Sequence, residues 1–97
     1  MKISYTREAI ADLERLRKFI EPKNPFAARR VSSELLDGIG NLRVFPKMGL
    51  PVTLAPDPDS VRDLFVGQYT VRYLLDTDHV VILRIWHGKE VKRESVK

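Results

Sequence analysis

The hydrophobic period of this chain changes once, and the change separates a helical half from a stranded half. Before Pro46, apolar side chains recur every three or four residues, whereas from Val61 onward apolar, largely β-branched residues come in three short runs separated by turn residues. A repeat of 3.6 residues is typical of helices, and short β-branched runs are typical of strands. The sequence therefore predicts an α+β fold in which helices precede an antiparallel sheet.

A short strand and a first helix are predicted at the N-terminus. Residues 3–5 favour a strand, and Thr6 is expected to cap the helix because its hydroxyl can accept a free N–H of the first turn. The helix is expected to extend to about Ile20, since Pro22 cannot continue it. Its apolar positions recur near the helical period: Ile10, Leu13, Leu16 and Ile20.

A second helix is expected to begin at Asn24-Pro25, a capping residue followed by proline at the first helical position. It should end near residue 45 and form a hairpin with the first helix over one face of the sheet. Gly38 lies inside it and predicts close packing against a neighbour, because glycine otherwise weakens a helix. Residues 46–59, rich in proline, predict an ordered surface loop with a short extended piece near residues 52–54.

Three strands are predicted after the loop, at residues 61–66, 69–75 and 79–86, joined by two-residue turns at Gly67-Gln68 and Thr77-Asp78. This register places Arg62 opposite Tyr73 and Val71 opposite Arg84, all on one face. That face would also hold Leu64, Tyr69, Ile82 and Trp86. The opposite face, which we expect the helices to cover, would hold Phe65, Leu74, Val81, Leu83 and Ile85. A three-residue turn would instead exchange the faces to which the side chains of the last strand point.

Arg62, Tyr73, Arg84 and Trp86 would together form a groove of planar cations and aromatic rings. Such a groove suits carboxylates, phosphates or stacked bases, and we predict that it binds a target or a partner. Each residue also has a structural interpretation. Arg62 can pair with a surface acid, and Trp86 can fill the core.

His87 is the other candidate for chemistry, because the pKa of imidazole permits proton transfer near neutral pH. A metal site is not expected, since the chain has no cysteine and only two histidines without H-x-x-x-H spacing. The Ser-His-Asp order, a glycine-rich phosphate loop and paired catalytic carboxylates are also lacking. We therefore expect no cofactor, and any reaction would act on nucleic acid.

Composition limits the remaining possibilities. Ninety-seven residues predict one domain, spanning residues 1–97. The net charge of +4 favours an acidic partner, either nucleic acid or protein. The sequence shows neither a signal peptide nor a run of about 20 apolar residues that could span a membrane. With no cysteine for disulfides, a cytoplasmic location is expected.

The order of elements and three residue patterns resemble the RelE/ParE superfamily of bacterial type II toxins. The patterns are Val61-Arg62-Asp63-Leu64, then Val66-Gly67-Gln68-Tyr69, and the ending Leu83-Arg84-Ile85-Trp86-His87-Gly88. The resemblance covers nearly the whole chain. It implies a sheet wrapped by a helical hairpin, and a growth-inhibiting toxin of a plasmid stabilisation or addiction module. It also implies a cognate antitoxin, acidic and with a DNA-binding N-terminal part, whose C-terminal segment silences the toxin.

The superfamily contains two mechanisms. RelE-like members cut mRNA on the ribosome with an arginine directly after the Gly-x-Tyr turn, a basic residue after the last strand and often a late tyrosine. The matching positions here hold Thr70, Gly88 or Lys89, and Lys92, which weakens a nuclease assignment. ParE-like members inhibit DNA gyrase and share an Arg-apolar-apolar-His ending, which residues 84–87 reproduce. Their usual acidic residue is shifted or replaced near Glu90.

The favoured hypothesis is therefore a ParE-like inhibitor of DNA gyrase that is not an enzyme. A RelE-like ribosome-dependent endoribonuclease is the alternative, and only there would His87 be catalytic. A third hypothesis is a non-toxic member that binds its antitoxin and regulates. The predicted target- or antitoxin-binding residues are Arg62, Tyr73, Arg84, Trp86, His87 and Lys89. The tail, residues 89–97, is either a solvated end or a further contact with an anionic target.

Overall fold

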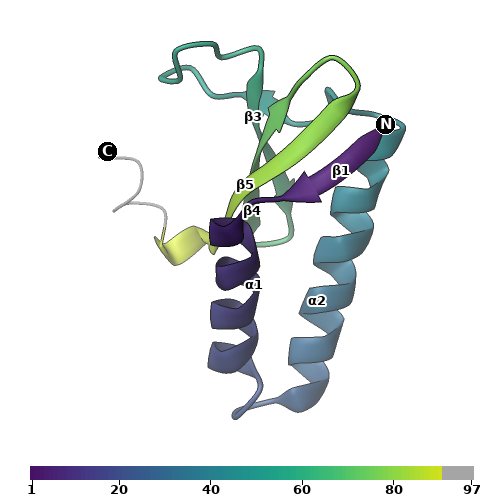
Figure 1. Cartoon of the computed structure of the whole chain (residues 1–97). Coiled ribbons are helices and arrows are strands. Elements are labelled where there is room, and N and C mark those ends of the chain that lie inside the picture. The colour runs from purple at the N-terminus through teal and green to yellow at the C-terminus, as the bar shows by residue number, and fades with distance from the viewer. Residues whose placement is uncertain (91–97) are drawn as a thin grey trace.

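A five-stranded sheet organises the chain, and a hairpin of two helices packs against it (Figure 1). The structure is a computed structural model and describes residues 1–90. The strands lie in the order β1-β5-β4-β3-β2, and neighbours are antiparallel except β1 and β5. The elements are β1 (Lys2–Tyr5), α1 (Arg7–Ile20), α2 (Pro25–Gly40), the 3-10 helix η1 (Asn41–Arg43), β2 (Leu50–Pro51), β3 (Val61–Val66), β4 (Tyr69–Leu75), β5 (His79–His87) and the 3-10 helix η2 (Gly88–Glu90).

Both helices begin where the sequence predicts them. The Thr6 hydroxyl accepts a hydrogen bond from the N–H of Ala9, and the Asn24 side chain accepts one from the N–H of Ala27 ahead of Pro25. These bonds satisfy N–H groups of the first turn that have no partner within the helix. The two helices lie side by side as the predicted hairpin. Neither has the length and apolar content needed to cross a membrane, which is true of every helix within residues 1–90.

The meander of β3, β4 and β5 is also confirmed. Val66 pairs with Tyr69 across a two-residue turn in which Gly67 has a φ of 59°, a left-handed value that glycine adopts readily. Leu75 pairs with Val80 across the second predicted turn. The sequence did not predict that β1 pairs with β5 in parallel. The short extended piece expected near residues 52–54 lies slightly earlier in the chain, as β2, and pairs with β3.

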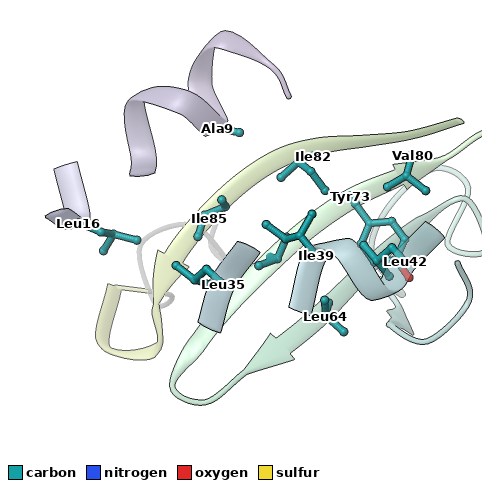
Figure 2. Packing of buried hydrophobic residues seen from close by; sticks show 11 residues of the cluster. Ala9, Leu16, Leu35, Ile39, Leu42, Leu64, Tyr73, Val80, Ile82 and Ile85 are labelled. Atoms are coloured by element: carbon teal, nitrogen blue, oxygen red, sulfur yellow. The ribbon is translucent and has the colours of Figure 1, made fainter. Parts of the chain in front are cut away.

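The core lies between the helices and one face of the sheet (Figure 2). We call this the helix face. Its largest fully buried side chains come from α2, η1 and the strands: Leu35, Ile39, Leu42, Val71, Tyr73, Val80, Ile82 and Ile85. Gly38 shows the predicted close packing, because a Cβ there would lie 2.8 Å from Cγ2 of Val66. The helix can approach the sheet closely only because this position has no side chain.

A β-bulge in β5 overturns part of the predicted register. Tyr73 pairs with Ile82, as predicted, but Arg72 pairs with Arg84, so Leu83 is an extra residue between the two pairs. The predicted pairing of Val71 with Arg84 is therefore wrong. The extra residue reverses which side chains of the following segment point to each face.

The assignment of the two faces is corrected accordingly. The helices cover the face predicted to be open, where Leu64, Val71, Tyr73 and Ile82 are buried. The face predicted to be covered carries Phe65, which is 58% exposed. Ile85 does lie in the core, but it reaches the helix face only because of the bulge.

Candidate functional site

The outer face of the sheet, opposite the helices, carries several charged and aromatic side chains from β3, β4 and β5. We use this name for the set Asp63, Phe65, Thr70, Arg72, Arg84 and Trp86. Arg72 and Arg84 are directly opposite each other on neighbouring strands. Like charges in this arrangement repel, so each guanidinium needs a nearby carboxylate to be stable there.

Arg84 meets its carboxylate at the edge of the sheet. Its Nε lies 2.8 Å from Asp12 Oδ2 and its Nη2 lies 3.2 Å from Oδ1, a two-point contact between β5 and α1. The Asp12 carboxylate also accepts hydrogen bonds from the N–H of Ile85 at 2.8 Å and from Arg15 at 3.2 Å. Asp12 is 4% exposed, so these bonds compensate the loss of water around its charge.

The pKa of Asp12 reflects this balance. Burial acts to raise it, but the hydrogen bonds from Arg84, Ile85 and Arg15 outweigh burial and hold the pKa below its usual value. Asp12 is therefore ionised at neutral pH and fixes the orientation of the Arg84 guanidinium.

The same carboxylate protects an edge of the sheet. Strand β1 pairs with β5 only as far as Ile82, so within residues 1–90 the second half of β5 has no strand neighbour on that side. Polar side chains replace it: Thr6 donates to the carbonyl of Leu83, Asp12 accepts from Ile85, and Arg15 donates to the carbonyl of Ile85. These bonds use backbone groups that would otherwise offer a template for another strand.

Arg72 has a carboxylate on the neighbouring strand and an aromatic ring beside it. Its Nε and Nη2 lie 2.8 and 3.0 Å from the two carboxylate oxygens of Asp63. The guanidinium carbon lies 5.0 Å from the centroid of the Trp86 ring, which is 3% exposed. Arg72, Trp86 and Arg84 therefore form one fixed cluster on the outer face.

Arg62 and Tyr73 lie elsewhere. They pair across β3 and β4, as predicted, but their side chains point to the helix face and contact the loop that follows η1. The predicted groove of Arg62, Tyr73, Arg84 and Trp86 is therefore wrong as a single surface. The bulge at Leu83 separates the first two residues from the last two.

His87 lies at the end of β5, on the helix face. Its ring makes an edge contact with Tyr69 at a centroid distance of 5.1 Å, and its Nε2 lies 3.0 Å from Gln68 Oε1. A hollow of about 550 Å³ opens beside it, with an apolar wall from α1. The lining residues are Arg15, Leu16, Phe19, Ile20, Tyr69, His87 and Glu90.

Glu90 closes one end of this hollow. Its carboxylate accepts hydrogen bonds from the N–H of His87 and from Arg15. Burial raises the pKa of Tyr69, and the negative charges of Glu90 and Glu34 raise it further, so the phenol is protonated at neutral pH. His87 therefore lies among hydrogen-bonding groups and apolar side chains, apart from the arginine cluster of the outer face.

Two predicted positions fall outside what the structure describes. The backbone of Lys89 belongs to η2, but its side chain is not described. The tail from residue 91, including Lys92, also lies outside the described residues. Among residues 1–90, no cluster of three or more histidine, cysteine, aspartate or glutamate side chains has the arrangement of a metal site.

Sequence reasoning missed three residues of this site. Asp63 and Arg72 follow from the predicted pairing of Arg62 with Tyr73, because the adjacent pair in that register is Asp63 with Arg72. Asp12 also gave a signal, since it lies three residues after Ala9 and four before Leu16 on the buried side of α1. A charged residue at a buried helical position requires a partner.

Known proteins resemble this chain over nearly its whole length. Residues 3–92 match the family described as the ParE toxin of the type II toxin-antitoxin system parDE. A relative from Caulobacter vibrioides (strain ATCC 19089 / CIP 103742 / CB 15), named Toxin RelE2, is 31% identical over 88 residues, which cover 90% of this chain and 94% of the relative.

Two solved structures share the fold. A chain of the chromosomal ParDE toxin-antitoxin system of P. aeruginosa superposes with a TM-score of 0.74 at 21% identity, covering 90% of this chain and 95% of that one. The RelBE2 toxin-antitoxin complex of Mycobacterium tuberculosis gives a TM-score of 0.60 at 25% identity, covering 89% and 88%. The family match and the RelE2 relative together show that the chain belongs to the ParE toxin family within the RelE/ParE superfamily of type II toxin-antitoxin systems.

Proposed function

We propose that this toxin arrests growth by binding DNA gyrase, and that an acidic cognate antitoxin neutralises it. The pairing of both outer-face arginines with carboxylates carries the proposal. Arg84 is bound to Asp12 and Arg72 to Asp63, so the four charges sum to zero. A cluster of this kind is rigid and specific in shape, which suits recognition of a protein surface.

Cleavage of RNA would require a different charge balance. In-line cleavage needs cations that neutralise the phosphate in the transition state and a group that protonates the leaving oxygen. Carboxylates beside both arginines reduce the positive potential that a phosphate would meet. Thr70, at the position where RelE-like nucleases carry an arginine, is 5% exposed. These features favour binding over nuclease chemistry.

An induction experiment separates the mechanisms. The toxin, expressed alone in a bacterium, should trigger DNA-damage signalling and filamentation while transcripts stay intact, and purified toxin should inhibit gyrase supercoiling. Rapid translation arrest with cleaved transcripts would instead establish the ribosome-dependent nuclease. Growth without any defect would favour the non-toxic regulator that only binds antitoxin.

Variants of the cluster test which residues recognise the target. Arg84→Lys keeps the charge but loses the two-point contact with Asp12, and we expect it to reduce gyrase inhibition at least about tenfold. The matched control is Arg17→Lys, at an exposed arginine of α1 with a 3.7 Å surface pair to Glu21, and it should inhibit as the unchanged protein does. Equal inhibition by both variants would rule out a recognition role for Arg84.

His87 needs its own test, because it lies apart from the arginines. If it contacts the target, His87→Ala should abolish toxicity while circular dichroism shows an intact fold. If the toxin were a nuclease with His87 as its acid or base, the same variant would still bind ribosomes but not cleave mRNA. Loss of folding in His87→Ala would show that the ring only supports Tyr69 and Gln68.

A further inference from the structure

The loop between η1 and β2 exposes an unusual share of apolar surface. We call residues 44–50 the apolar loop. Val44, Phe45 and Leu50 are 71%, 63% and 62% exposed, and Met48 is 44% exposed. A hollow of about 570 Å³ is lined by Val44, Phe45, Pro46, Lys47 and Met48, mostly with apolar atoms. Contiguous apolar surface of this kind on a small protein is typical of an interface.

The loop is held in place by the two residues predicted to bind a target. The Tyr73 hydroxyl accepts a hydrogen bond from the N–H of Gly49 at 3.0 Å and donates one to the carbonyl of Pro46 at 2.7 Å. Arg62 Nη1 donates to the carbonyl of Gly49 at 2.9 Å and lies 3.4 Å from that of Lys47. Arg62 and Tyr73 thus act as positioning residues for the apolar loop.

Gly49 shows how closely the loop fits its support. A Cβ at this position would lie 2.8 Å from the Tyr73 ring and 2.9 Å from the carbonyl oxygen of Asp63. The loop backbone therefore lies directly on β3 and β4 rather than projecting into solvent. An exposed apolar surface that is already ordered binds a partner without a further loss of loop entropy.

Charge indicates what covers the loop. Lys47 is exposed, lines the hollow and forms no ion pair within residues 1–90. A second copy of this chain packed on the loop about a two-fold axis would bring each Lys47 toward its own copy, which is unfavourable. A segment with apolar side chains and a flanking carboxylate fits both the hollow and this cation.

We propose that the apolar loop is a docking site for an acidic, apolar segment of the cognate antitoxin. The proposal rests on the proposed function, because it takes the antitoxin as the partner. Phe45 and Met48 present the apolar contact, Lys47 meets a carboxylate, and Tyr73 with Arg62 keeps the loop ordered.

Binding measurements with matched variants test the proposal. The probe is the purified acidic product of the open reading frame adjacent to the toxin gene, titrated against full-length toxin. Phe45→Ser and Lys47→Glu should each raise the Kd at least about tenfold, the effect of an interface hot spot. The controls Phe26→Ser, at a phenylalanine 75% exposed at the start of α2, and Lys18→Glu, on the exposed side of α1, should change it less than about twofold. Equal Kd values for the loop variants and the controls would overturn the proposal.

Tyr73→Phe tests the positioning role, because it removes only the hydroxyl that holds the loop. Its Kd for the same probe should rise at least about fivefold. Gly38→Ala serves as a control for stability, since it strains the packing of α2 on Val66 away from the loop. If Gly38→Ala weakens binding as much as Tyr73→Phe does, reduced stability rather than loop order explains the effect, and the positioning role is lost.

Growth assays keep this proposal separate from the proposed function. Phe45→Ser, induced alone, should arrest growth as the unchanged toxin does, but co-expression of the adjacent acidic protein should fail to rescue growth. If the unchanged toxin causes no arrest, the proposed function fails, while the Kd values still decide whether the loop is the docking site. If Phe45→Ser is rescued fully, docking at the loop is wrong whatever the toxin's target.

Discussion

Asp12 of α1 and Arg84 of β5 form a two-point ion pair between the first helix and the last strand. The carboxylate is buried and the arginine side chain is 38% exposed, so one partner belongs to the interior and the other faces outward. Because Asp12 also accepts the N–H of Ile85, the pair fixes both the edge of β5 and the direction of the guanidinium. The same contact thus contributes to stability and orients the arginine on which the proposed recognition depends.

Replacement of Asp12 should be costly for stability. Asp12→Ala leaves the N–H of Ile85 without its acceptor and Arg84 without its carboxylate, so we expect the free energy of unfolding to fall by about 2–4 kcal/mol. Urea denaturation followed by circular dichroism measures this change. Glu14→Ala, at an exposed position of the same helix, should cost less than about 0.5 kcal/mol. A loss below about 1 kcal/mol for Asp12→Ala would show that water replaces the carboxylate easily.

The lowered pKa of Asp12 predicts a dependence of stability on acid. The native state holds the ionised form more strongly than the unfolded chain does, so Asp12 contributes its stabilisation fully above its unfolded pKa of about 3.9. That contribution is lost as the pH falls through the lower pKa of the folded state. The difference in unfolding free energy between the unchanged protein and Asp12→Asn should therefore shrink between about pH 5 and pH 2. A difference that is constant over this range would contradict the assignment.

Thr6 joins the cap of α1 to the edge of β5 through one hydroxyl. It accepts from the N–H of Ala9 and donates to the carbonyl of Leu83. Thr6→Ala should lower the free energy of unfolding by about 1–2 kcal/mol, whereas Thr6→Ser should keep most of it. Thermal denaturation of both, with Thr53→Ala at an exposed threonine of the long loop as the control, measures the effect. Similar losses in Thr6→Ala and Thr6→Ser would point to the methyl group instead.

Gly38 and Gly40 should respond oppositely to the same substitution. Gly38→Ala places a methyl group 2.8 Å from Val66, and the overpacking should destabilise by about 1–3 kcal/mol. Gly40→Ala meets only the flexible end of Arg43 at 3.8 Å, so its higher helix propensity should make it neutral or stabilising by up to about 1 kcal/mol. The double variant Gly38→Ala with Val66→Ala relieves the contact and provides the check. If the double variant loses as much unfolding free energy as the two single variants lose together, the contact with Val66 does not cause the destabilisation by Gly38→Ala.

The parts of the fold that depend on local chemistry could be predicted from the sequence. Thr6, Asn24 and Pro25 define the starts of the helices, and Gly67 permits the tight turn that sets the pairing of β3 with β4. Arg62 was therefore placed correctly opposite Tyr73. Each of these features involves residues close together in the chain, where capping and turn rules apply directly.

The location of Arg84 could not be obtained in this way. Residues 80–83 are all apolar, so either face of β5 satisfies a hydrophobic pattern, and no glycine or proline marks Leu83 as a bulge. The extra residue is stabilised by distant groups instead, since Thr6 binds the carbonyl of Leu83 and Asp12 binds Ile85. The contacts of Arg62 and Tyr73 could not be predicted for a similar reason. Their partners are distant in the sequence and lie in a loop whose path depends on the assembled sheet.

The parallel pairing of β1 with β5 also affects the order in which a ribosome can produce a folded toxin. Ile3 precedes its partner Val80 by 77 residues in the sequence. Closing a contact between distant parts of a chain is slow compared with forming local helices. At about 5–20 residues per second, several seconds pass between the synthesis of the two strands. The helices can form during that time, but the fixed position of Arg84 exists only once β5 has been synthesised.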